Sequence, residues 1–361
     1  MRGGAQNGGK GPGRDPARVI FYGVLAVLSL GLVFILGLHS GHTRNAAHGT
    51  VVEAAKTLRL VLDETRNWVL GGDPVHFLQP ARHVGTGVTL NKTRDDKLVL
   101  ISGFFDGSTE LRLIERDGTV LARWPVAYSD TLPLGDGRPS RPNTDWNVDI
   151  HGAVAMPDGS VVFNWEYNGT QRMSRCGDAM WVLDDFTHHS LERAEGGGFW
   201  IPGRRVLPSP DGDATANPFP PFTGKPRWDV YYDDLILRVS DEGEVLEEVS
   251  VMQVLYDSGL APVLTATGFS FWPTGGWDTE LVHLNKITEL PADLAGAFPG
   301  FEMGDLLISL RQYNLIAVID PKLWRVRWHQ TGPWVRQHDP EFLPDGTIAV
   351  FDNGHYRTDF G

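Results

Sequence analysis

The chain has 361 residues, of which 41% are hydrophobic and 21% charged, and this composition is that of a globular protein with one large domain or two ordinary ones. A formal net charge of −13 argues against nucleic acid as a partner, because binding phosphates requires an excess of Lys and Arg. The single cysteine, Cys176, excludes an internal disulfide and a cysteine-based metal site.

The first predicted element is a membrane anchor at residues 19–38, VIFYGVLAVLSLGLVFILGL, which carries no charge and matches the thickness of a bilayer core. The tail before it, residues 1–18, is basic, whereas Arg44 is the only full charge shortly after it. The positive-inside bias therefore predicts a cytoplasmic N-terminus and a periplasmic or otherwise extracytoplasmic remainder. A cleaved signal peptide is the alternative, but its apolar region is usually only about 7–15 residues long. We predict a single-pass membrane protein.

A stalk is predicted at residues 39–75. Within it, the stretch TVVEAAKTLRLVLDETRNWVL at residues 50–70 places apolar residues at helical spacing among charges, which indicates an amphipathic helix. From residue 76 to residue 361 the pattern changes to short β-rich runs separated by turn residues, such as KLVLISGFF, SVVFNWEY and TIAVFDNG. Such runs indicate an all-β domain: a sandwich, a barrel or a propeller.

A repeat decides among these three architectures. Units of roughly 40–55 residues with four strands each are typical of a β-propeller. Four units open with a histidine: His151, His189, His283 and His338. An earlier stretch, LISGFF–ELRLIERDG–VLARWPV, resembles a unit without the histidine, and a loop insertion is predicted around residues 206–228. Because the last unit has only two strands, we expect about four and a half blades and a domain that is incomplete at its C-terminus.

The repeated histidine predicts a site on the propeller axis. His151 precedes Gly159 by eight residues, and His338 precedes Gly346 by the same number. The first strand of each blade lines the central channel, so side chains at one position of several blades converge there. The alternative is that each histidine caps a turn or bonds a neighbouring blade.

Two further side chains extend this candidate site. Asn285 follows His283 by two residues and is expected to face the same side of its strand. Arg311 lies in the next predicted strand, DLLISLRQY. Imidazoles, an amide and a guanidinium in one pocket suit a tetrahedral oxyanion such as sulfate or phosphate. A histidine-bound metal is an alternative, but without an H-E-x-x-H motif we predict no metal and no other cofactor.

Several motifs resemble those of the bacterial arylsulfate sulfotransferases. They are H-L-N at residues 283–285, the following L-L-I-S-L-R-Q, and Q-H-D-x-x-F-L-P-D-G-x-x-x-x-F-D-N-G at the end of the chain. The doublet His188-His189 also resembles a histidine motif of that family. The resemblance covers roughly residues 145–361 and implies a six-bladed propeller and a sulfotransferase that needs no nucleotide donor.

The resemblance also implies roles for the site residues. His338 would take the sulfuryl group from an aryl sulfate ester and pass it to a phenolic acceptor. Three residues would hold the sulfate oxygens: His283, Asn285 and Arg311. His189 would make a further contact, although an alternative alignment gives that role to His151. The acids Asp233 and Asp234 are interpreted as turn residues at a blade edge. The alternative function is a non-catalytic, membrane-tethered propeller that binds a ligand or protein outside the membrane.

Overall fold

The computed structural model divides the chain into two compact units, residues 1–80 and 81–361, which are considered separately. The residues that it describes are 16–43, 46–70, 87–88, 90–135, 141–142, 144–145, 148–208, 230–266 and 280–354. Three predicted features therefore lie wholly or mostly outside the described residues: the basic tail, the end of the stalk and the loop around residues 206–228.

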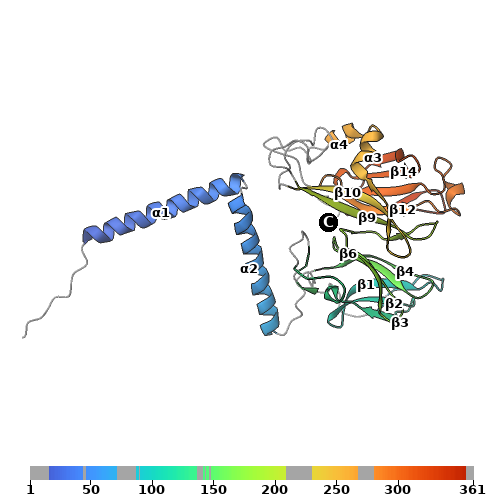
Figure 1. Ribbon diagram of the computed structural model, residues 1–361, viewed down its shortest axis with the longest axis horizontal. Helices are drawn as coiled ribbons and strands as arrows, with labels where there is room; N and C mark the ends of the chain where they lie inside the picture. The colour runs from blue at the N-terminus through green and yellow to red at the C-terminus, as the bar shows by residue number, and fades with distance from the viewer. Residues whose placement is uncertain are drawn as a thin grey trace, which may run out of the picture. The chain divides into compact units, whose positions relative to one another are not determined.

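The first unit contains two helices, α1 (Pro16–Thr43) and α2 (Ala46–Leu70) (Figure 1). Helix α1 includes the predicted span at residues 19–38. With a mean hydropathy of 2.7 it is apolar enough to cross a membrane, and it is also long enough. A membrane anchor and an N-terminal signal sequence share this character. Helix α2 includes the predicted amphipathic helix at residues 50–70.

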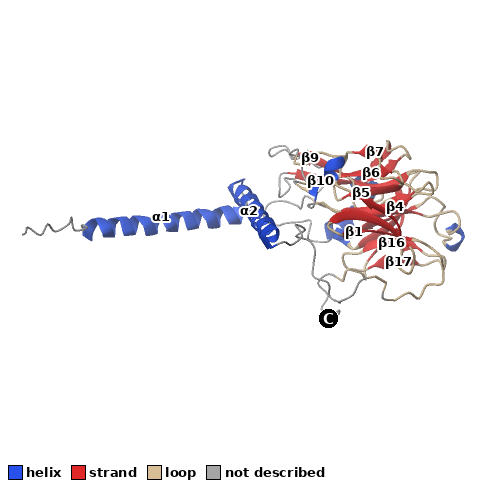
Figure 2. Cartoon of the chain, turned by 90° about the horizontal axis from the view of Figure 1, so that it is seen from below, coloured by secondary structure: helices blue, strands red, loops and turns tan. Residues whose placement is uncertain are grey.

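The second unit is a propeller-like array of antiparallel sheets, as the sequence predicts. In each sheet the strands follow one another in chain order, and Figure 2 shows β4 to β7 in this order. The first sheet has three strands, β1 (Val99–Phe105), β2 (Ser108–Ile114) and β3 (Val120–Pro125). The second has four, β4 (Ile150–Ala155), β5 (Val161–Trp165), β6 (Gly169–Met173) and β7 (Ala179–Leu183).

The remaining sheets continue the same meander. The third consists of β8 (Glu192–Arg193), β9 (Phe199–Pro208), β10 (Val230–Val239) and β11 (Val245–Ser250). The fourth consists of β12 (Leu284–Glu289), β13 (Leu306–Leu310), β14 (Leu315–Asp320) and β15 (Arg325–Thr331). The last described pair is β16 (His338–Phe342) and β17 (Ile348–Phe351). The described residues therefore form five consecutive blades or parts of blades.

The hydrophobic cores lie between successive sheets. In β5, Phe163 packs into the core shared with the first sheet, whereas its neighbour Val162 packs into the core shared with the third. In β13, Ile308 and Leu307 likewise belong to two different cores. Because side chains alternate across a strand, a central strand with a core on each side is apolar at nearly every position. This explains the continuous apolar runs SVVFNW and DLLISL.

Helices between β11 and β12 were not predicted. They are α3 (Val251–Asp257), which contacts β10, β11 and β15, and α4 (Ala261–Ala266) (Figure 1). The hydroxyl of Ser250 caps α3 by accepting a hydrogen bond from the Gln253 N–H. Three short 3-10 turns complete the described structure: Tyr128–Asp130, Ala295–Ala297 and Arg311–Tyr313. The expectation that Arg311 lies in a strand was wrong, since β13 ends one residue earlier.

Candidate active site

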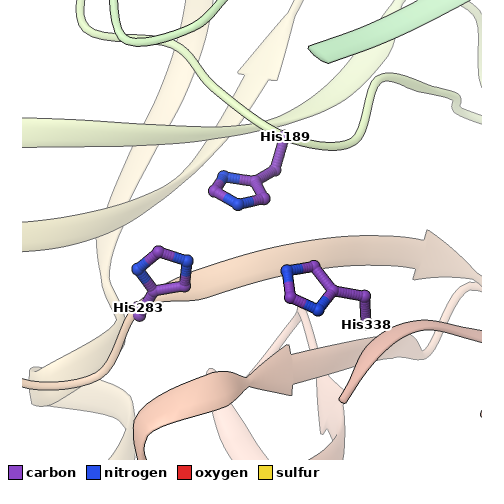
Figure 3. Close-up of side chains that lie close together, drawn as sticks. All are labelled: His189, His283 and His338. Atoms are coloured by element: carbon purple, nitrogen blue, oxygen red, sulfur yellow. The ribbon is translucent and has the colours of Figure 1, made fainter. Parts of the chain in front are cut away.

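Three imidazoles from three successive sheets meet in one place. His189 lies shortly before β8, His283 directly precedes β12, and His338 begins β16. Figure 3 shows the three rings facing a common space. The ring centroid of His189 is 4.9 Å from that of His283 and 5.8 Å from that of His338. One nitrogen from each ring lies within 4.8 Å of one nitrogen from each of the others.

For His189 and His338, the hairpin turn after the histidine explains this convergence. In three sheets a glycine with φ between +80° and +85° lies eight residues after the histidine. The N–H of this glycine donates a hydrogen bond to the carbonyl of the residue that lies five positions after the histidine. The carbonyl and glycine pairs are Met156 and Gly159, Ala194 and Gly197, and Leu343 and Gly346. The turn fixes the register of the inner strand, so His151, His189 and His338 occupy equivalent positions. The spacing from His189 to Gly197 was missed because that turn lacks the Pro-Asp pair.

The backbone at these histidines is irregular. His189 has φ of +52° and His283 has φ of +54°, which is uncommon for a residue with a side chain. The pairing registers of β4, β12 and β16 are each interrupted within a few residues of their histidine. Bulges of this kind bend a strand and redirect a side chain, and they are frequent beside active sites.

The Nδ1 atoms of His283 and His338 each have an acceptor outside the common space. Nδ1 of His338 lies 3.1 Å from the backbone carbonyl of Arg336 and 3.1 Å from the side-chain amide of Asn353. Nδ1 of His283 lies 2.9 Å from Oε2 of Glu280, although this contact does not have hydrogen-bond geometry. Carbonyl and carboxylate oxygens only accept hydrogen bonds, so these contacts favour a proton on Nδ1 of both neutral imidazoles, with the Asn353 amide turned so that its oxygen faces His338. The lone pair of each ring is then on Nε2.

The tautomer of the third imidazole, His189, is fixed by the preceding residue, His188, which makes two contacts. His188 is completely buried, and its Nε2 lies 3.3 Å from the backbone carbonyl of Gly203. This carbonyl places the His188 proton on Nε2, which leaves Nδ1 as an acceptor. Nδ1 of His188 lies 2.8 Å from Nδ1 of His189, which must therefore be the donor. His189 thus has the same tautomer as His283 and His338.

Burial keeps these imidazoles uncharged. It lowers the pKa of His283 to about 4, against the opposing effect of the Glu280 carboxylate. Burial also lowers the pKa values of His189 and His338, and neighbouring imidazoles contribute to the shift of His189. The site therefore presents neutral rings near pH 7, and neutral imidazole is the nucleophilic form.

His151 belongs to the same cluster but has a different role. Its ring centroid is 4.6 Å from that of His189, and its Nδ1 accepts the backbone N–H of His189 at 3.2 Å. Its proton is consequently on Nε2, which lies 3.6 Å from Oε1 of Glu166. The sequence left His151 and His189 as alternatives, and the structure places both at the site.

Arg311 and Asn285 also adjoin the cluster. Nη2 of Arg311 lies 3.4 Å from Oε2 of Glu280, and the Arg311 backbone N–H donates to the His283 carbonyl at 3.1 Å. Asn285 is buried and donates through Nδ2 to the carbonyl of Gln337 at 2.8 Å, while its Oδ1 has no partner among the described residues. Asn285 therefore ties β12 to the residue directly before His338.

Several residues of this region were missed or misinterpreted. Glu280 was not singled out, yet it contacts His283, Arg311 and Arg204. The interpretation of Asp233 and Asp234 as turn acids was wrong, since both lie within β10. Asp234 is fully buried, accepts the His283 N–H at 2.9 Å and has its pKa raised to about 7 by burial. These contacts join different sheets, and no local motif encodes them.

A buried lysine links the three strands that begin at these histidines. Lys286 is 2% exposed, and its Nζ lies 2.5 Å from Glu192 and 2.8 Å from Asp339 and also contacts Glu341. Glu192, Lys286 and Glu341 each follow the histidine of their own sheet by three residues. Lys286 therefore connects β8, β12 and β16 next to the imidazole cluster.

A family model described as arylsulfotransferase (ASST) matches residues 152–360. The chain belongs to the arylsulfotransferase family. The match includes His189, His283, Arg311 and His338 and begins directly after His151. A search of curated proteins found no significant match.

This arylsulfotransferase family member also resembles several solved structures, but at low sequence identity. A protein of unknown function from Bacteroides caccae is 13% identical with a TM-score of 0.39, over 71% of this chain and 65% of that one. The WD40 β-propeller domain of Doa1 is 11% identical with a TM-score of 0.38, and the match covers 72% of this chain and 58% of that one. Virginiamycin B lyase from Staphylococcus aureus is 14% identical with a TM-score of 0.35, and the match covers 72% of this chain and 68% of that one. The chain thus spans less than two thirds of the first two structures.

Gly152 allows the segment around His189 to approach β4. A Cβ atom on Gly152 would lie 2.3 Å from the His189 carbonyl oxygen and 2.9 Å from the Leu191 nitrogen. We expect Gly152→Ala to lower the free energy of unfolding by about 1–3 kcal/mol, because backbone atoms must move. Urea denaturation measures this change. Gly300→Ala, where a Cβ meets nothing within 4 Å, is the control, and equal stabilities of the two variants would contradict the prediction.

Removing the Lys286 ammonium leaves three carboxylates close together. We expect Lys286→Met to lower the free energy of unfolding by about 3–5 kcal/mol, as when one partner of a buried ion pair is deleted. Adding Glu192→Gln to this variant should recover part of the loss, because one of the repelling charges is removed. Urea denaturation of the single and double variants tests this, and no recovery would argue against an electrostatic cause.

Proposed function

We propose that this protein is a sulfotransferase that moves a sulfuryl group from an aryl sulfate ester to a phenolic acceptor through a sulfohistidine on His338. The observation that carries the proposal is the convergence of three neutral imidazoles with their Nε2 lone pairs free. Membership of the arylsulfotransferase family supports the reaction class. No nucleotide donor is required.

In the first step, Nε2 of His338 attacks the sulfur atom. A nitrogen–sulfur bond forms, the bond from sulfur to the aryl oxygen breaks, and its electron pair leaves with the phenolate. The ring then carries a positive charge, which the hydrogen bond from its Nδ1–H to the Arg336 carbonyl stabilises. Fixing Nδ1 in this way also keeps Nε2 aimed at the substrate.

In the second step, the oxygen of the accepting phenol attacks sulfur, and the nitrogen–sulfur bond returns its electrons to His338. The phenol must lose its proton, and Nε2 of His189 or His283 is a base of suitable chemistry. Because burial lowers the pKa of both rings, the imidazolium passes this proton to solvent, and the phenolate that departs in the first step takes its proton from solvent. The two separate steps give ping-pong kinetics.

Cationic and polar groups would hold the sulfuryl oxygens. The Arg311 guanidinium stays charged, and its Nε has no hydrogen-bond partner among the described residues. We assign the oxygens first to Arg311. His283 and His189, with His151 beside it, would contact them as donors only in the protonated form reached when they take the phenol proton, and Asn285 through its second Nδ2 hydrogen. Charge spread over three oxygens is best stabilised by donors that are already in place.

The first test is turnover of 4-nitrophenyl sulfate with phenol as acceptor. We expect release of 4-nitrophenolate to depend on phenol and to fall on the order of a thousandfold or more in His338→Ala. His329→Ala, a change at an exposed residue of β15, should leave the rate unchanged. Incubation with donor alone should add one sulfuryl group to the peptide that contains His338, as detected by mass spectrometry.

Two outcomes would contradict this proposal. Turnover that survives in His338→Ala would exclude His338 as the nucleophile. Failure of the wild-type protein with a wide panel of aryl sulfates would instead favour the non-catalytic binding propeller.

We further propose that α1 anchors the protein with its N-terminus in the cytoplasm and the propeller on the periplasmic side. The only cysteine, Cys176, is exposed on the propeller and provides a test. A membrane-impermeant maleimide should label Cys176 in cells with a permeabilised outer membrane. A Cys176→Ser protein with a new cysteine at Ala5 should be labelled only after lysis. The reverse pattern would overturn the orientation, and loss of the N-terminus would indicate a cleaved signal sequence.

A further inference from the structure

The three converging imidazoles present only acceptors to the space between them. Nδ1 of each ring is directed to Glu280, His188, or Arg336 with Asn353, and the three Nε2 atoms remain. His283 is 4% exposed, and neither of its ring nitrogens has a hydrogen-bond partner among the described residues. Three lone pairs that face one point repel one another and are complementary to a cation.

We propose that Nε2 of His189, His283 and His338 binds one divalent transition-metal ion of the zinc class. Neutral imidazole is a preferred ligand of zinc, copper, nickel and iron, and three histidines with an open fourth position form a common zinc site. Magnesium and calcium, which require oxygen ligands, do not suit these donors.

The groups around the imidazoles match those of a metal site. A histidine that binds metal through one nitrogen usually donates its other N–H to a carboxylate or a backbone carbonyl. His283 has Glu280 in this position, and His338 has the Arg336 carbonyl. His189 has the Nδ1 of buried His188, itself fixed by a carbonyl. These contacts favour the tautomer that a metal ion requires in all three rings.

The geometry requires a small contraction of the cluster. A tetrahedral zinc ion with bonds of about 2.0–2.1 Å separates its nitrogen ligands by about 3.3 Å. The candidate nitrogens lie within 4.8 Å of one another, so each ring moves by about an ångström or less. His151 does not complete the site, because its Nδ1 accepts the His189 N–H and its Nε2 carries the proton. The fourth position is left for water or an anion.

Metal binding and sulfuryl transfer use the same atoms. A zinc ion on Nε2 of His338 removes the lone pair that would attack sulfur, and it occupies the bases on His189 and His283. The ion therefore acts as an inhibitor that competes with the sulfate ester. The binding of metal stands independently of the proposed function, whereas the inhibition rests on it.

The test uses the full-length protein in detergent, purified without a histidine tag and treated with a chelator. Isothermal titration with Zn²⁺ should give one ion per chain, and Co²⁺ should give the intense visible absorption of a tetrahedral site. We expect His189→Ala, His283→Ala and His338→Ala each to weaken Zn²⁺ binding by more than about a hundredfold, beyond the 10–100-fold usual for a supporting residue. His329→Ala should leave the affinity unchanged.

Glu280→Gln adds a milder test that keeps all three ligands. We expect it to weaken Zn²⁺ binding about 10–100-fold, since the amide supports the His283 ring less well. Thermal unfolding of each variant without metal shows whether it is folded. A folded triple-alanine variant that still binds one Zn²⁺ would overturn the proposal, as would Co²⁺ that stays octahedral.

Turnover separates the two proposals. If Zn²⁺ binds as expected and competes with 4-nitrophenyl sulfate, both stand. If Zn²⁺ binds but no aryl sulfate is turned over in metal-free buffer, only the sulfotransferase proposal fails. If turnover is normal and no ion binds to the histidines, only the metal site is wrong.

Discussion

The candidate site depends on the contacts that hold Nδ1 of each central imidazole. Without the Arg336 carbonyl, Glu280 and His188, each ring could turn or change tautomer, and Nε2 would have no fixed direction. Each contact comes from a different part of the chain, but all three produce the same result. The Nδ1 side is occupied by a partner, and the Nε2 side faces the common space.

The sheet arrangement supplies the positions of these rings. In the sheets of His151, His189 and His338, the histidine lies at an equivalent position near the start of the inner strand, because the hairpin turn after it sets the register. Lys286 adds a second level of contact three residues further along, where it joins Glu192 and Glu341. The three imidazole rings are uncharged, with the ion pairs of Glu280 beside them, and the ion pairs of Lys286 lie three residues further along the strands.

The sequence predicted what local patterns determine. Short apolar runs and turn residues indicated the sheets, and the distance from His338 to Gly346 indicated an inner-strand position, since the glycine conformation fixes that turn. The contribution of Glu280 could not be predicted, because its contacts with His283, Arg204 and Arg311 arise from the packing of separate segments. Asp234 was misinterpreted for a similar reason. The charge of an acidic side chain inside a buried strand is compensated by groups from distant parts of the chain, and the residues next to it in the sequence do not indicate which groups these are.

The charges of the pocket have a further consequence for what it can bind. The cations Arg204 and Arg311 both contact Glu280, and Arg204 also approaches Asp234, so much of their charge is already compensated. The three central imidazoles offer lone pairs and no donors at Nε2. Free sulfate carries two negative charges and needs donors on every side, so this arrangement disfavours it. In the proposed reaction, a sulfate monoester, which carries one charge, would present its electrophilic sulfur to the lone pair of His338. The features that disfavour inorganic sulfate are compatible with that proposal, because the attack on sulfur would itself generate a positive charge beside the sulfuryl oxygens.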